Sequence, residues 1–129
     1  MIIELNKILD ERGNLTFFES NNHVPFEIKR TYWIYDVPGG ETRGGHAFKK
    51  QNEFIIALSG SFDVVTHDGI AEKRTHLNRS YFGLLIPRMH WRSLDNFSTN
   101  SLALIVSDLE YDPEDYIRDF NDFLQVKNG

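Results

Sequence analysis

Short runs of β-branched and aromatic residues, separated at close intervals by turn residues, extend through most of this sequence. Ser59-Gly60-Ser61 and His67-Asp68-Gly69 predict tight connections, because glycine accepts the positive φ angles that short turns need. Many short strands without a central helix predict an all-β sandwich or barrel. The expected strands are residues 15–19, 26–37, 54–58, 62–66, 70–77, 81–86 and 102–106.

The C-terminal segment is the exception, because it has the features of one helix. Asp112 is placed to cap it, Pro113 suits the first helical position, and residues 114–115 put negative charge in the first turn. An apolar stripe then recurs at three- and four-residue spacing: Tyr116, Phe120, Phe123 and Leu124. We predict a short helix that packs this stripe against the outside of the barrel.

Length and charge narrow the range of functions. A chain of 129 residues without a linker or an internal repeat predicts a single domain over residues 1–129. Fourteen Lys and Arg against nineteen Asp and Glu give a net charge of −5, without the basic footprint of a nucleic-acid-binding protein. There is no cysteine, no apolar run long enough for a membrane helix and no secretory signal at the start. We therefore expect a cytoplasmic protein that binds neither nucleic acid nor membrane.

Residues 28–36 carry aromatic side chains on both faces of an extended strand. Alternation places Arg30 and Tyr32 on one face, and Trp33 and Tyr35 on the other. A strand with a pocket on one side and a subunit interface on the other would have this pattern. A central strand packed on both faces would have it too.

The segment from residue 40 to residue 60 resembles the first sequence motif of the cupin superfamily. That motif is a glycine, five residues, His-x-His, three or four residues, Glu, six residues and a glycine. The matching positions are Gly40, His46, Glu53 and Gly60, and Phe48 occupies the position of the second histidine. The resemblance implies a cupin jelly roll, a double-stranded β-helix.

Metal-dependent cupins bind a divalent metal through the His and Glu positions of this motif and a histidine of a later strand. His46, Glu53 and His90 would form such a set, of the two-histidine, one-carboxylate type that holds non-haem iron. Phe48 removes a ligand at a position where the motif has one, so we expect no metal and no other cofactor. A metal-dependent cupin remains an alternative.

Segments spread over nearly the whole chain resemble the nucleotide-sugar 3,4-ketoisomerases, including the C-terminal domain of WxcM-type proteins. They are IKRTYWIYD at 28–36, RGGHA at 43–47, ALSGS at 57–61, FS at 97–98 and YDPEDYIRDF at 111–120. The resemblance implies a metal-free jelly-roll homodimer with exchanged N-terminal strands. It also implies an isomerase that moves the keto group of a dTDP-linked 4-keto-6-deoxyhexose from carbon 4 to carbon 3. Such a reaction serves the synthesis of 3-amino-3,6-dideoxy sugars for surface polysaccharides.

The proposed chemistry needs a base that removes the proton next to the carbonyl and a group that returns a proton to the former carbonyl carbon. An imidazole suits the base, and His46 matches the histidine of the family's Arg-Gly-x-His motif. Most members have a second histidine where this chain has Phe48, and an apolar ring cannot relay a proton. We therefore predict His46 and Tyr32 as the catalytic residues, with His90 as another possible acid.

Cationic and aromatic side chains are the candidates for binding the nucleotide sugar. We assign Arg30, Arg43 and Lys49 to the diphosphate, because guanidinium groups bind phosphate oxygens bidentately. Arg43, Tyr32 or Arg92 would stabilise the enediolate, and Trp33 or Trp91 would stack on the thymine base. A cupin that binds a nucleotide sugar without catalysis is the second hypothesis, since Phe48 replaces an active-site histidine.

Overall fold

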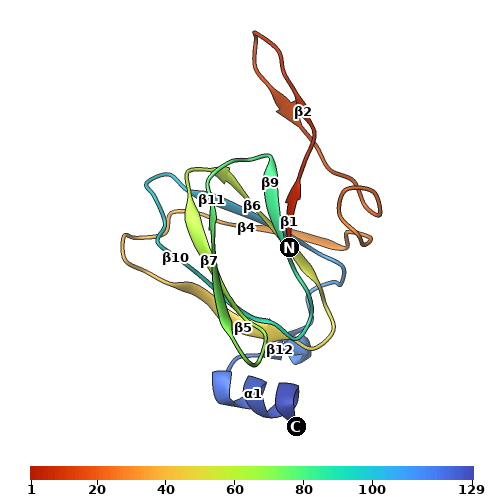
Figure 1. Cartoon of the computed structure of the whole chain (residues 1–129), viewed down its shortest axis with the longest axis vertical. Helices are drawn as coiled ribbons and strands as arrows, with labels where there is room; N and C mark the ends of the chain where they lie inside the picture. The colour runs from red at the N-terminus through yellow and green to blue at the C-terminus, as the bar shows by residue number, and fades with distance from the viewer.

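Two antiparallel β-sheets face each other in the computed structural model, which describes all 129 residues (Figure 1). The first sheet has the strand order β1 (Ile2–Glu4), β9 (Phe82–Ile86), β6 (Glu53–Ser59), β11 (Leu102–Ser107) and β4 (Arg30–Ile34). The second has the order β12 (Tyr116–Ile117), β5 (Arg43–Phe48), β10 (Trp91–Asp95), β7 (Phe62–His67) and β8 (Glu72–Leu77). The all-β jelly roll expected from the sequence is confirmed.

The core lies between the two sheets. Alternation along β6 points Ile55 and Ala57 inward, where they pack with buried side chains of the second sheet such as Val64 and Leu94. The opposite face of β6 is also buried, because Phe54 and neighbouring side chains pack under the segment that contains Val24 and Phe26. Burial on both faces explains why this strand reads as a continuous apolar run instead of an alternating one.

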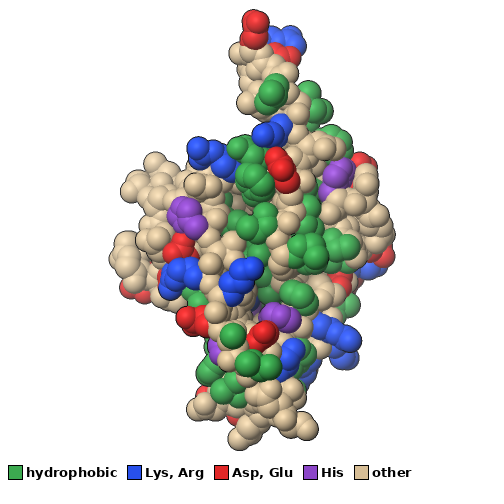
Figure 2. Space-filling view, in the orientation of Figure 1, with side chains coloured by type: hydrophobic (Ala, Val, Ile, Leu, Met, Phe, Trp, Pro, Cys, Tyr) green, Lys and Arg blue, Asp and Glu red, His purple; other side chains and the backbone are tan.

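A two-stranded hairpin extends away from the sheets near the N-terminus (Figure 1). It consists of β2 (Lys7–Ile8) and β3 (Leu15–Thr16), which pair with each other and with neither large sheet. The segment 15–19 predicted as a strand contributes only its first two residues to β3. Hydrophobic side chains are visible on this projecting hairpin in Figure 2, and Ile8, Leu9 and Leu15 are all more than half exposed.

The strand predictions are wrong in several places. The segment 26–37 contributes only Arg30–Ile34 to a strand, and β1, β2, β5, β10 and β12 were not predicted. The sequence of β5 is Arg-Gly-Gly-His-Ala-Phe. It has no β-branched residue and two glycines, which have low β propensity, so its composition does not predict a strand. Its pairing with β10 has a β-bulge, because two steps along β10 from Arg92 to Leu94 oppose three steps along β5 from His46 to Arg43.

The prediction of a single helix capped by Asp112 is wrong in the extent of the helix. Asp112 does cap a helix, but only a 3₁₀ turn at Pro113–Asp115, and the chain then extends as β12 along the edge of β5. The buried Asp115 carboxylate fixes this path, because it accepts hydrogen bonds from the backbone N–H groups of Lys50 and Gln51. The helix α1 (Phe120–Asn128) begins only afterwards, capped by Asp119. None of the helices has the length and apolar composition of a membrane-spanning segment.

Candidate active site

A cavity of about 430 Å³ is lined by β4, β5, β10 and β12, which come from both sheets. It contains four arginine side chains, although the protein as a whole carries a net charge of −5. The lining residues are Arg30, Tyr32, Trp33, Ile34, Arg43, Gly44, Gly45, His46, Arg92, Tyr116 and Arg118. A cavity with this charge is suited to an anionic ligand.

Strand register decides which side chains enter this cavity. Arg92 of β10 pairs with His46 of β5, and Tyr116 of β12 pairs with Phe48 of β5. Residues that are directly opposite in an antiparallel pair share a face of the sheet, as do residues i and i+2 of one strand. The two pairs therefore lie on one face, toward the cavity, and the alternate residues point to the other face, toward α1.

His46 lies in an apolar and aromatic surrounding at the wall of the cavity. Its ring centroid is 4.7 Å from that of Phe48 and 5.0 Å from that of Tyr116, both in edge-on contact. Burial, and then the charges of Arg92, Arg118 and Arg30, lower the pKa of His46 to about 2. The Nε2 atom is buried without a hydrogen-bond partner in the chain. His46 is therefore a neutral imidazole at physiological pH, able to accept a proton.

Arg92, Glu53 and Tyr32 form a buried network beside His46. The Arg92 Nε atom donates to Glu53 Oε1 at 2.9 Å, and its Nη2 atom donates to Glu53 Oε2 at 3.2 Å and to the Tyr32 hydroxyl at 2.7 Å. The Tyr32 hydroxyl in turn donates to Glu53 Oε2. Burial raises the pKa of Tyr32 well above its usual range. The network fixes the Arg92 guanidinium, which is only 1% exposed, as a cation at the cavity wall.

Gly44 is required for this arrangement. Its φ of +73° favours glycine, and a Cβ atom at this position would lie 2.2 Å from the Arg92 Nη1 atom. The guanidinium therefore occupies space that a side chain on β5 would fill.

Arg30 reaches the cavity from the opposite sheet. Its guanidinium lies 4.4 Å from the ring centroid of Tyr32, and its Nη2 atom donates to the Tyr116 hydroxyl at 3.2 Å. The Nη1 atom is buried without a partner in the chain. An unpaired cationic donor of this kind is suited to a phosphate or carboxylate oxygen.

The structure brings together five of the seven site residues expected from the sequence: Arg30, Tyr32, Arg43, His46 and Arg92. Lys49 lies past the end of β5 and donates to the backbone carbonyl of Glu114. Trp91 occupies the face of β10 opposite to the cavity.

The Trp91 ring packs against α1, with its centroid 5.4 Å from that of Phe120 and 5.9 Å from that of Phe123. This position does not allow it to stack on a base in the cavity.

Two hydroxyl-bearing or charged side chains of this cavity, those of Tyr116 and Arg118, were not predicted from the sequence. Both lie in the segment that resembles the ketoisomerases, and that resemblance was the signal that could have identified them. The regular apolar spacing instead placed Tyr116 in a helix.

The alternative metal set of His46, Glu53 and His90 is not assembled, and no group of three such side chains anywhere in the chain is placed to hold a metal ion. The Glu53 carboxylate is bonded to Arg92 and Tyr32. His90 lines a different cavity, near the end of β9.

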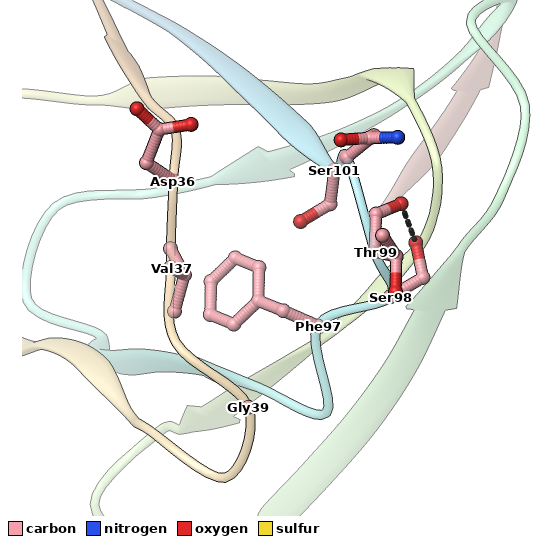
Figure 3. A pocket seen from close by; sticks show the side chains of 8 residues that line it. Asp36, Val37, Gly39, Phe97, Ser98, Thr99 and Ser101 are labelled. Carbon is pink, nitrogen blue, oxygen red and sulfur yellow. Dashed lines mark hydrogen bonds between the residues drawn. The ribbon is translucent and has the colours of Figure 1, made fainter.

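A second cavity, of about 330 Å³, lies between residues 36–39 and 97–101 (Figure 3). Asp36 is its only charged residue, and Ser98, Thr99, Asn100 and Ser101 supply neutral polar groups around the Phe97 ring. It has no cation for a phosphate, whereas the cavity around His46 has four arginines beside a neutral imidazole. The cavity around His46 is therefore the candidate active site.

Comparison with known proteins shows the family to which this chain belongs. The family model described as FdtA, WxcM-like, C-terminal, matches residues 1–128. The chain belongs to this family. It is 36% identical, over 95% of its length and 88% of the relative, to a TDP-4-oxo-6-deoxy-α-D-glucose-3,4-oxoisomerase of Aneurinibacillus thermoaerophilus.

Solved structures of related proteins have the same fold as this chain. A 3,4-ketoisomerase from Helicobacter canadensis is 37% identical with a TM-score of 0.97, over 100% of this chain and 97% of the other. A variant of the 3,4-ketoisomerase QdtA from Thermoanaerobacterium thermosaccharolyticum, solved in complex with TDP-4-keto-6-deoxyglucose, is 32% identical. Its TM-score is 0.97 over 99% of this chain and 93% of the other. The expected membership of the ketoisomerase family is confirmed.

Proposed function

We propose that this protein is an isomerase that converts a TDP-linked 4-keto-6-deoxyhexose into the corresponding 3-keto sugar. The observation that carries the proposal is a neutral, unpaired imidazole, His46, in a cavity with four arginines. The relatives named as 3,4-ketoisomerases support the choice of reaction. Because nucleotide-linked sugars are made in the cytoplasm, the proposed substrate also favours a cytoplasmic protein.

His46 acts as the base in the proposed mechanism. It removes the proton from carbon 3 of the sugar, the electron pair forms a double bond to carbon 4, and an enediolate results. Arg92 lies opposite His46 in the strand pairing, so its fixed guanidinium is placed to stabilise the negative charge. Return of a proton to carbon 4 and loss of the proton on the carbon 3 hydroxyl complete the isomerisation.

The remaining arginines are proposed to bind the diphosphate. Arg30 has a buried, unpaired Nη1 atom, and Arg43 and Arg118 line the same cavity. Phosphate oxygens would supply the acceptors that these guanidinium groups lack in the free protein.

A bound diphosphate would also change the pKa of His46. Part of the low pKa of His46 comes from Arg92, Arg118 and Arg30, whose positive charges oppose a second positive charge on the imidazole. An anionic ligand offsets these charges and raises the pKa of His46 toward neutrality. The substrate would thereby make His46 a stronger base only after binding.

We further propose a homodimer with exchanged N-terminal strands. The projecting hairpin exposes Ile8 and Leu15. Trp33 of β4, at the edge of the cavity, and Tyr35, just past the end of β4, are 58% and 61% exposed. Apolar side chains exposed in this way favour contact with a second protein surface. Sedimentation equilibrium tests this directly, and a monomer at micromolar concentration would contradict it.

Proton NMR in deuterated water, with TDP-4-keto-6-deoxyglucose and a chelator, tests the proposed activity. We expect a 3-keto product to accumulate as deuterium enters the sugar. His46→Gln should abolish both changes, whereas His90→Gln, which alters a histidine outside this cavity, should retain them. An unlabelled sugar whose resonances broaden on binding would instead indicate a nucleotide-sugar-binding protein without catalysis.

A further inference from the structure

The sequence predicts Tyr32, or else His90, as the acid that works with His46, because Phe48 replaces the second histidine of the family. His90 does not line this cavity. Two tyrosine hydroxyls lie in the same cavity, those of Tyr32 and Tyr116. A phenol is a competent general acid, provided that its proton is free to be given to the substrate. The hydrogen bonds that the two hydroxyls make show which of them has a proton free to give.

The Tyr32 hydroxyl is fully engaged within the protein. It donates its proton to Glu53 Oε2 and accepts a hydrogen bond from Arg92 Nη2. The Glu53 carboxylate is itself bonded to Arg92 at both of its oxygens. For Tyr32 to act as an acid, this buried network would have to break in each catalytic cycle.

The Tyr116 hydroxyl has the opposite arrangement. It accepts a hydrogen bond from the Arg30 Nη2 atom at 3.2 Å, and it donates to no group of the chain. The register of β12 on β5 places the Tyr116 ring 5.0 Å from the His46 ring and 4.6 Å from the Phe48 ring. Its proton is thus free, beside the base, in the cavity that would hold the sugar.

The surroundings of Tyr116 also suit the phenolate that remains after proton transfer. The Arg118 guanidinium lies 4.2 Å from the centre of the Tyr116 ring, and Arg30 contacts the oxygen directly. Two positive charges next to a developing anion stabilise it. Phe48 contributes an apolar surface beside both rings.

Building on the proposed function, we propose that Tyr116 is the general acid of the isomerisation. It gives its hydroxyl proton to the carbonyl oxygen at carbon 4 while His46 takes the proton from carbon 3. This proton neutralises the enediolate, whose developing charge Arg92 stabilises, so that the neutral enediol forms and Tyr116 is left as a phenolate. The phenolate then takes the proton of the carbon 3 hydroxyl as the new ketone forms, and the His46 imidazolium returns its proton to carbon 4. Both residues end in their starting states, and no other reactant is consumed.

One phenol can serve both steps because the two oxygens of the sugar are on neighbouring carbons and lie in one plane in the enediol. Tyr116 would therefore move a proton between adjacent oxygens, while His46 moves one between adjacent carbons. Tyr32 keeps a positioning role, since it holds the Arg92 guanidinium through the network with Glu53.

The test compares Tyr116→Phe with Tyr32→Phe, and uses Tyr111→Phe as the matched control. Tyr111 is 62% exposed and does not line the cavity. Its ring centroid is 6.0 Å from that of Tyr116 and 5.1 Å from the Arg30 guanidinium, and Tyr111→Phe keeps this ring and removes only the hydroxyl. For each protein, kcat and KM are measured with TDP-4-keto-6-deoxyglucose, together with deuterium entry at carbon 3. The dissociation constant for TDP shows whether the site is still folded.

We expect Tyr116→Phe to lower kcat and deuterium entry by about 100-fold or more, the range of general acid catalysis, with little change in KM or in TDP binding. Tyr111→Phe should behave like the wild type. A Tyr116→Phe variant that keeps kcat and raises only KM would show that Tyr116 merely positions Arg30, and would overturn the proposal. So would loss of kcat in Tyr32→Phe alone. A wild-type chain without turnover would refute the proposed function itself, and with it the role of Tyr116.

Discussion

Replacing Glu53 by leucine should destabilise this protein more than almost any other single substitution, because it leaves a charge buried without a counter-ion. Arg92 is 1% exposed, and Glu53 accepts two of its hydrogen bonds, at 2.9 Å and 3.2 Å. Without Glu53, the guanidinium keeps only the Tyr32 hydroxyl and a long contact to the Gly44 carbonyl at 3.5 Å.

The magnitude follows from the cost of breaking a buried ion pair. Removing one partner of such a pair costs about 3–5 kcal/mol, which is a large part of the roughly 5–15 kcal/mol that stabilises a domain. For a chain of this size, each kcal/mol lowers the Tm by about 3–6 °C. We therefore expect Glu53→Leu to melt about 10–30 °C below the wild type.

Thermal unfolding followed by circular dichroism, with urea titration alongside, measures this loss. The double variant Glu53→Leu/Arg92→Met should recover most of it, since both charges are then absent and the volume is nearly kept. Glu27→Gln breaks an exposed ion pair with Lys29 and serves as the control, with little expected change in Tm. A Glu53→Leu variant that melts close to the wild type would refute this reasoning, as would a double variant that is less stable than either single one.

Three further predictions concern the base, the bulge and the last helix. Because the pKa of His46 is about 2 in the folded chain and about 6.5 in the unfolded chain, the unfolded chain takes up the proton first as the pH falls. The contribution of His46 to the free energy of unfolding should therefore drop by about 2 kcal/mol from pH 7 to pH 5. A His46→Gln variant whose stability in urea depends on pH as that of the wild type does would contradict this. Gly44→Ala should reduce kcat/KM about 100-fold by displacing Arg92, and steady-state kinetics like those of the wild type would disprove the close approach. Asp119→Ala should cost about 1 kcal/mol in urea unfolding, because the carboxylate caps α1 at the backbone N–H of Asp122; an unchanged midpoint would argue against the cap.

Local signals in the sequence were sufficient for much of the fold. The runs at 54–58, 62–66 and 102–106 form strands, and the Asp68-Gly69 turn joins β7 to β8 as expected. Apolar residues and glycine turns act over a few residues, so a pattern in the chain is enough to detect them. The motif around His46 likewise pointed to residues that line one cavity, the candidate active site, although not to all of the residues of that cavity.

The segment from Asp112 to Phe123 shows where local patterns were not enough. Its apolar spacing suits a helix, but the unpaired edge of β5 and the buried Asp115 carboxylate draw Tyr116 and Ile117 into a strand. The competing interactions come from residues more than sixty positions earlier in the chain, so no local window contains them.

The sequence by itself determined the jelly roll, the family and the histidine, because these depend on residue types and on their spacing along the chain. Only the tertiary structure decided which side chains share the cavity. The register of β5 with β10 turned Arg92 inward and Trp91 outward, and the register of β5 with β12 brought Tyr116 next to His46. A shift of one residue in either pairing would exchange those faces, and long-range packing, which no short segment encodes, fixes that register.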